Sequence, residues 1–282
     1  MHLLLNFKSS DFRIDFSLLS QRSKTLVQSL NLKLLKFDWS LDFQSNCHFY
    51  VIHLEDSYHQ HIDITISAFP IDPNEHLGKL KLNGTALPVG RHYNKGSSIL
   101  GVRKENMSSR ERMEVMDLLT AHLLDIFRVE NHWLTLNCVN DTVNCFVFKY
   151  TKRFSRLMVS GRRRLRKVEI KFIMEQLIVT DSLFVRCPVT PNYKYSGPLK
   201  MSRISVSDAC WLTVDSVMNM DCTRFYANTT SLTCDNLNAI LKKWSNGQMN
   251  NLVVFSIINP DMSTLYSQHP SVHTPCSESP LT

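Results

Sequence analysis

The sequence predicts an α/β fold (α+β overall), in which a short helical segment and a small antiparallel sheet precede repeat-like βα units with parallel strands. Three observations predict this fold: β-rich segments between residues 37 and 100, an amphipathic helix at 108–127, and alternating strand-like and helix-like segments from 203 to 258. Residues 259–282 differ, because they hold four prolines and no Lys or Arg. We therefore expect a helical segment at 1–37, a β-rich connecting region at 38–105, an α/β domain at 106–258 and a flexible tail at 259–282.

The first clear element is residues 17–30, in which apolar side chains fall on one helical stripe. The stripe consists of Leu18, Leu19, Leu26, Val27 and Leu30. Residues 21–24 are polar and interrupt the stripe. We expect two short helices joined at that break.

The next region has the patterns of paired strands. Residues 49–52 and 62–66 are rich in β-branched and aromatic side chains, and Asn83-Gly84 is typical of a tight hairpin turn between 80–82 and 87–89. His59 and His61 alternate along one strand, as metal ligands sometimes do. Because no third ligand lies nearby in the sequence, we interpret both as surface histidines and expect no metal site.

Residues 108–127 form the strongest predicted helix. Ser108 and Glu111 have the spacing of a capping box, in which each side chain satisfies a free amide of the other residue. Apolar residues follow at helical spacing up to Phe127. Further on, residues 133–136 and 146–148 are strand-like, and 184–201 are typical of loops because they contain three prolines.

The C-terminal part alternates strands and helices at close spacing, which indicates parallel strands with crossover helices. Strands are expected at 204–206, 223–227 and 252–257, and Thr213 and Thr233 are suited to cap the helices between them. Equivalent strand centres lie 21 residues apart from Ile204 to Phe225 and 29 apart from Phe225 to Val254. Stacked units of this kind leave an exposed strand face or edge loops, which are common binding surfaces.

The longer of these two helices carries apolar residues at positions i, i+3, i+4 and i+7, and Gly247 after its last turn suits a helix stop. We expect four residues to form the structural core of the C-terminal domain: Trp211, Leu237, Leu241 and Trp244. An exposed role for the two tryptophans in partner binding is the alternative.

The net charge of +7 is concentrated at residues 152–167, where Arg and Lys crowd together. Such a stretch is typical of a solvated surface, and nucleic-acid binding is the alternative that we favour less. No Gly-rich phosphate loop, Gly-x-Ser-x-Gly or His-Glu-x-x-His sequence is present. We therefore expect no catalytic residues and no cofactor, and interpret the chain as an interaction protein rather than an enzyme.

The eight cysteines include no pair with the two-residue spacing of a zinc or redox site. The first residues lack the apolar run of a secretory leader, and no apolar run approaches the roughly 20 residues that cross a bilayer. We expect reduced thiols, no membrane partner, and a cytoplasmic and/or nuclear location.

Residues 208–257 resemble the type-2 F-box-associated domain at the C-terminus of nematode F-box proteins. The resemblance rests on Trp211, Thr213, Met218, Asn219, Asp221, Cys222, Asp235, Leu237, Asn238, Leu241, Trp244 and Gly247, which occur in the family's order. Residues 77–89 and 113–127 are similar to the family's middle region. Residues 17–30 look like the second half of an F-box, although the Leu-Pro segment and first helix of that motif have no counterpart in residues 1–16.

The resemblance implies a substrate-recognition subunit of a Skp–cullin–F-box type ubiquitin ligase. The C-terminal domain would bind a protein substrate whose identity the resemblance leaves open. The F-box remnant would bind the Skp-type adaptor of the cullin–RING ligase through Leu18, Leu19, Leu26, Val27 and Leu30, and this surface is expected to be incomplete. The alternative is a ligase-independent protein-binding module.

Overall fold

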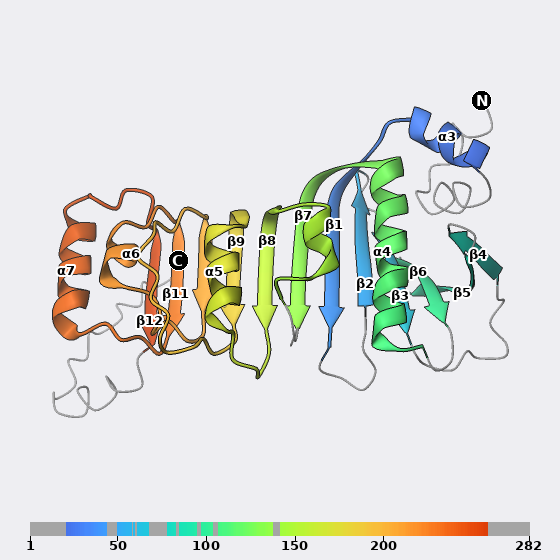
Figure 1. Ribbon diagram of the computed structural model, residues 1–282. Coiled ribbons are helices and arrows are strands. Elements are labelled where there is room, and N and C mark those ends of the chain that lie inside the picture. Colours follow the sequence, from blue (N-terminus) through green and yellow to red (C-terminus); the bar gives the residue numbers. More distant parts are fainter. Residues whose placement is uncertain are drawn as a thin grey trace, which may run out of the picture.

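The computed structural model describes residues 21–43, 50–57, 59, 61–67, 78–82, 85–94, 97–103, 107–137 and 142–258. Its strands form one twelve-stranded sheet in the order β12-β11-β10-β9-β8-β7-β1-β2-β3-β6-β5-β4 (Figure 1). Helices lie along one face of this sheet, and the predicted α/β fold class is confirmed.

The N-terminal part of the sheet is mainly antiparallel. It contains β1 (Leu32–Asp42), β2 (Tyr50–Asp56), β3 (His61–Ser67), β4 (Gly78–Leu82), β5 (Thr85–Asn94) and β6 (Ser97–Arg103). The expected hairpin is present as the antiparallel pair β4 and β5, while its turn at 83–84 lies outside the described residues. The expected small sheet is not separate, because β1 pairs in parallel with β7 and so joins it to the rest.

From β7 onward every pair of neighbouring strands is parallel. The strands are β7 (Phe127–Asn137), β8 (Arg153–Ser160), β9 (Ile178–Arg186), β10 (Arg203–Val206), β11 (Arg224–Asn228) and β12 (Val254–Ile258). Ile204 pairs with Phe225, which confirms the predicted period of 21 residues. Phe225 pairs with Phe255, so the next period is one residue longer than predicted.

The described helices are α3 (Gln21–Ser29), α4 (Ser109–Ile126), the 3₁₀ helix η1 (Phe146–Lys149), α5 (Lys167–Glu175), α6 (Val214–Met218) and α7 (Cys234–Ser245). Three of them, α4, α6 and α7, begin at the predicted caps. The capping box of Ser108 and Glu111 is present on α4, and Thr213 and Thr233 cap α6 and α7. After α7, Gly247 has a φ of 70°, and the amides of Gly247 and Gln248 bond back to Trp244 and Lys243, which is a Schellman stop. Among the described residues, no helix has the length and apolar character needed to cross a bilayer.

Four local predictions need correction. Residues 21–24 belong to α3 rather than to a break, because their backbone continues the helix. Residues 32–37, expected as helix, are strand β1, since they pair on both sides with β2 and β7. Residues 146–148 form η1 rather than a strand, and the loop expected from residue 184 starts only after β9 ends at Arg186.

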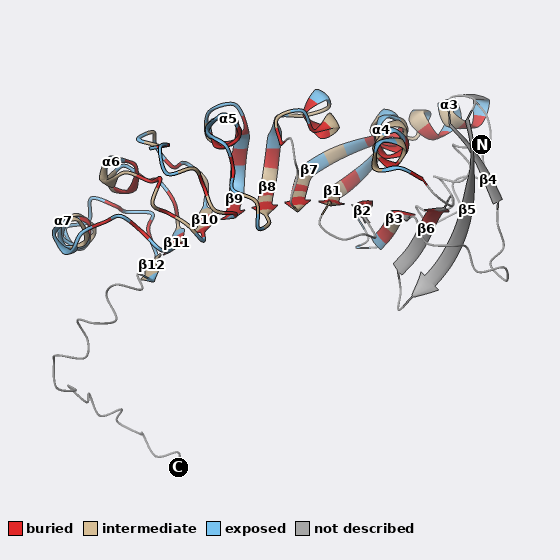
Figure 2. Cartoon of the chain, turned by 60° about the horizontal axis from the view of Figure 1, so that its bottom comes forward, coloured by how far each residue is buried: buried red, intermediate tan, exposed pale blue. Residues whose placement is uncertain are grey.

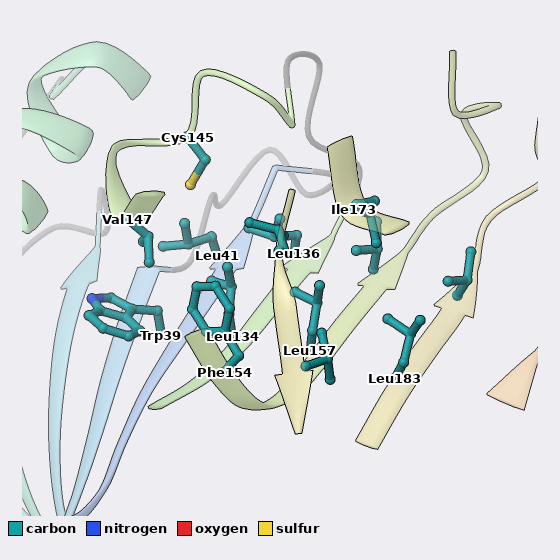
Figure 3. Close-up of a cluster of buried hydrophobic side chains, with 14 of the residues drawn as sticks. Trp39, Leu41, Leu134, Leu136, Cys145, Val147, Phe154, Leu157, Ile173 and Leu183 are labelled. Carbon is teal, nitrogen blue, oxygen red and sulfur yellow. The ribbon is translucent and has the colours of Figure 1, made fainter. Parts of the chain in front are cut away.

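The core lies between the helix layer and the sheet. Strand alternation sends one set of apolar side chains toward the helices, including Leu134, Leu157 and Leu183 on three neighbouring strands (Figure 3). Trp39 on β1 is fully buried in the same layer, and its indole N–H donates to Thr120 Oγ1 of α4 over 3.0 Å. This hydrogen bond connects β1 to α4 in the middle of the molecule.

The four predicted core residues of the C-terminal domain differ in burial. Trp211 is 2% exposed, and Leu237 and Trp244 are partly buried and pack against the core. Leu241 is 45% exposed, so its assignment to the core was wrong. The reason is that α7 is the last helix of the row, with α6 on one side only (Figure 1). The buried residue of α7 is Ile240.

Trp244→Ala is expected to lower the free energy of unfolding by about 2–3 kcal/mol. The indole N–H of Trp244 donates to the Leu252 carbonyl over 3.0 Å, and its ring lies 6.4 Å from that of Phe255, so the change loosens the β12 edge. Leu241→Ala on the same helix is expected to cost less than about 0.5 kcal/mol. Urea unfolding followed by circular dichroism measures both, and equal losses would contradict the burial difference.

Candidate functional site

Among the residues that the structure describes, no helix covers the face of the sheet opposite α4 to α7 (Figure 2). On β7, Leu134 and Leu136 are buried under the helices, whereas Trp133 and Thr135 alternate with them and are half-buried. The same alternation holds on β10, where Ile204 is buried and Arg203 is not. The sequence expectation of an exposed strand face is therefore met, and this open sheet face is the candidate site.

Strand register places basic and aromatic side chains side by side on this face. Trp133 of β7 pairs with Arg156 of β8, Arg156 pairs with Ser182 of β9, and Ser182 pairs with Arg203 of β10. Arg203 in turn pairs with Arg224 of β11. Side chains that are far apart in the sequence thus share one line across five parallel strands.

Cations of this line contact rings, two of which, Phe184 and Tyr226, lie on the next line of the strand register. Lys36 Nζ lies 4.4 Å from the centre of the Trp133 ring, and the Arg156 guanidinium lies 5.0 Å from both Trp133 and Phe184. The Arg203 guanidinium lies 5.8 Å from Phe184 and 5.5 Å from Tyr226. These are cation–π distances, which are most favourable where water is partly excluded. We call Lys36, Trp133, Arg156, Phe184, Arg203 and Tyr226 the arginine–ring ladder.

The ladder arginines have unused hydrogen-bonding capacity. The Nε atoms of Arg156 and Arg203 are buried and have no hydrogen-bond partner. Within the part of the chain that the structure describes, no carboxylate forms a salt bridge with Arg156, Arg186 or Arg203. Buried donors without acceptors are costly, so a ligand that supplies acceptors would be stabilised there.

The other end of the open face is acidic. Asp38 of β1 pairs with His53 of β2, which pairs with Asp63 of β3. Burial raises the pKa of Asp38, and its Oδ1 atom has no hydrogen-bond partner. The hydrogen bond from His53 Nδ1 to Asp63 Oδ1, 2.6 Å long, raises the pKa of His53. Apart from Lys36 on β1 and Asp181 on β9, the face is therefore polarised, with carboxylates over β1 to β3 and arginines over β8 to β11.

Two hollows are found near these elements. One of about 390 Å³ opens beside Trp133 and Lys36 at the end of the ladder, and Glu55 and Asp181 also line it. The other, of about 420 Å³, lies on the outside of α7 against Leu241 and Trp244. The first is lined by residues of the open face, whereas the second is lined by residues of α7 alone.

The residues predicted to bind an adaptor are only partly on the surface. Leu18 and Leu19 lie outside the described residues. Val27 is fully buried, Leu30 is half-buried, and Leu26 is 37% exposed. α3 rests on α4, since Lys24 forms an ion pair with Asp125 and Gln28 donates to the Asp125 carbonyl.

The histidines and cysteines have ordinary structural surroundings. His59 is exposed and its Nδ1 lies 2.7 Å from Glu55 Oε1 on the same side of β2. Within the described residues, no three His, Cys, Asp or Glu side chains are grouped to hold a metal. Burial raises the pKa of Cys222 to about 11 and that of Cys145 to about 12, which disfavours their thiolate forms.

Sequence reasoning missed the ladder, although a signal was present. The 21-residue period links Ser182, Arg203 and Arg224 on one line, and it links Phe184, Ser205 and Tyr226 on the next. Extending the period backward from β10 would have identified β9 and placed its Phe184 beside Ser205, two residues along the strand from Arg203. The Arg156 and Trp133 rungs have no such signal, because the spacing between their strands is different.

Fold and site together define a repeat-like α/β protein with a polarised open sheet face. Residues 192–257 match the family described as F-box associated, which covers β10, α6, β11, α7 and most of β12. The C-terminal part of the chain therefore contains an F-box-associated domain. Comparison with the curated proteins and with the solved structures gave no match.

Proposed function

We propose that this chain is a substrate-recognition subunit of a Skp–cullin–F-box type ubiquitin ligase, as in the nematode F-box proteins that it resembles. The observation that carries the proposal is the F-box-associated domain at 192–257. This segment supplies two rungs of the ladder, Arg203 and Tyr226, so the family match and the open face coincide. The protein substrate would bind across the open sheet face.

In this proposal the chain performs no chemistry itself and acts in the cytoplasm and/or nucleus. It holds a substrate near the ligase, so the local concentration of the substrate rises and modification becomes effectively intramolecular. The Skp-type adaptor would bind the segment that includes α3, with Leu26 as its exposed apolar contact.

A ligase-independent binding module is the second candidate. It is favoured by the burial of Val27, since a side chain packed in the core cannot also contact an adaptor. Nucleic-acid binding through the basic stretch is less favoured, because Arg163 and Arg166 are held by the carboxylate of Glu169.

Capture of the purified Skp-type adaptor by the full chain tests the recruitment proposal. We expect capture, and we expect Leu26→Asp to weaken it by about tenfold or more, because a charge would enter an apolar contact. Leu241→Asp places the same charge at an exposed leucine of α7 and is the matched control. Failure of the unaltered chain to capture the adaptor would favour the ligase-independent module.

A further inference from the structure

The strongest unexplained feature of the open face is a gathering of positive charge around one ring. The guanidinium groups of Arg156, Arg186 and Arg203 lie 5.0, 5.7 and 5.8 Å from the centre of Phe184. The three positive charges lie around one ring, and none of them forms a salt bridge within the described part of the chain, although Asp38 attracts Arg156 at longer range. An anionic ligand would neutralise this positive charge.

The rings hold the guanidinium groups ready for such a ligand. Stacking on Trp133 and Phe184 restricts the Arg156 side chain, which lowers the entropy lost when it binds. Stacking occupies the flat faces of a guanidinium and leaves its N–H edge to donate. Two parallel N–H bonds match the two oxygens of a carboxylate.

The spacing of the arginines favours several separate carboxylates over one phosphate. Arg156 is on β8 and Arg203 on β10, with β9 between them. Neighbouring strands lie about 4.8 Å apart, so the two positions are roughly 9.6 Å apart. One phosphate is too small to meet both. An extended peptide in the polyproline-II conformation has three residues per turn and rises about 3.1 Å per residue, so it places side chains i and i+3 on one side about 9.3 Å apart.

Two observations disfavour a single-stranded nucleic acid on this face. Base stacking needs open ring faces, and the rings of Phe184 and Tyr226 are already in contact with guanidinium groups. The acidic end around Asp38 and Asp63 would also repel a continuous phosphate backbone. A peptide can instead place acidic residues over one end and neutral or basic residues over the other.

We propose that the arginine–ring ladder binds an extended acidic segment of the protein substrate, with carboxylates at every third residue set against Arg156 and Arg203. The inference rests on the proposed function, in that it takes the C-terminal domain to bind a protein. It adds the substrate class: a segment with spaced Asp or Glu residues, lying across β8 to β10.

Fluorescence anisotropy with a short labelled peptide that carries Glu at every third position, with Pro and Ala between to favour the polyproline-II conformation, tests the proposal on the full chain. We expect binding that weakens with added salt, and no binding when Gln replaces Glu. The double variant Arg156→Gln, Arg203→Gln is expected to bind about tenfold more weakly, because charge-assisted bonds are lost. Arg110→Gln removes an exposed arginine of α4, on the helix side, and is expected to leave binding unchanged.

Several outcomes would overturn the inference. They are equal binding of the Gln peptide, unchanged affinity of the double variant, tighter binding of a peptide with one phosphoserine, tighter binding of oligouridylate, or no binding at all. Circular dichroism on the double variant confirms that the sheet is intact. Adaptor capture by the same variant is expected to be normal, since α3 lies apart from β8 to β10 (Figure 1). If the unaltered chain binds the peptide but does not capture the adaptor, the recruitment proposal is refuted and the inference about the arginine–ring ladder still holds.

Discussion

Replacing Glu169 by alanine is expected to lower the free energy of unfolding by about 3–5 kcal/mol, because it breaks a buried ion pair from one side. The Glu169 side chain is fully buried. Its two carboxylate oxygens accept hydrogen bonds from Arg163 Nη1 and Nη2 over 2.9 and 2.7 Å. They also accept from the backbone amides of Arg166 and Thr142 over 2.8 and 3.3 Å.

The free energy of unfolding falls because Glu169→Ala leaves the partners of this carboxylate without an acceptor. The Arg163 guanidinium would keep its charge in a half-buried position, and the Thr142 amide would lose its acceptor. The connection between residue 142 and the start of α5 would therefore loosen. Glu169→Gln retains the shape and some of the hydrogen bonds, so it is expected to be less destabilising than alanine.

The same carboxylate makes stability depend on pH. Burial by itself would raise the pKa of Glu169, but the hydrogen bonds from Arg163, Arg166 and Thr142 outweigh it and lower the pKa to about 2 from a usual 4.5. Because the folded-state pKa is depressed, the stabilisation is complete above pH 4.5 and is lost as the pH falls toward 2. The shift corresponds to about 3 kcal/mol.

Urea unfolding at pH 7 and at pH 3 measures both effects. Part of the difference in stability between the unaltered chain and Glu169→Ala should disappear at pH 3, because the depressed pKa of Glu169 contributes less to the free energy of unfolding there. Glu175→Ala on the same helix, whose exposed carboxylate lies 3.7 Å from Lys171, is the control and should cost less than about 0.5 kcal/mol. A Glu169→Ala variant as stable as this control would refute the buried ion-pair argument.

The basic stretch at 152–167 shows what the sequence could and could not predict. Its charge density was evident, and several members are exposed, as expected of a solvated surface. The sequence could not show that Arg163 and Arg166 neutralise a buried carboxylate, because burial of Glu169 depends on the packing of α5 against residue 142. Nor could it show that Arg156 stacks on rings from two other strands.

The strands that were missed carry polar residues on the open face. β8 alternates Arg156 and Ser160 with Leu157 and Val159, and β9 carries the polar run Thr180, Asp181 and Ser182 after its first two residues. Without a helix layer, that face need not be apolar, so the usual signal of a buried parallel strand is absent. The helix N-caps were predictable by contrast, since the caps of α4, α6 and α7 depend on neighbouring residues alone.

Trp39→Ala is expected to lower the free energy of unfolding by about 3–5 kcal/mol and to destabilise both ends of the sheet at once. Trp39 is fully buried, lies 4.5 Å from the Phe37 ring and 5.7 Å from the His132 ring, and is bonded to Thr120. Its strand pairs with β2 on one side and β7 on the other, so β1 connects the mainly antiparallel strands to the parallel ones.

This position makes Trp39→Ala a test of how the chain divides. A boundary near residue 105 would let the parts before and after it unfold separately, whereas a sheet continuous through β1 should unfold as one unit. Hydrogen exchange of amides in β2 and in β8 can follow both sides, and we expect Trp39→Ala to speed exchange in both by the same factor. Trp133→Ala, on the open face of the neighbouring strand, removes an equally large ring that is only half-buried and should cost about 1–2 kcal/mol. Faster exchange in β2 alone would show that the strands from β7 onward form an independent domain.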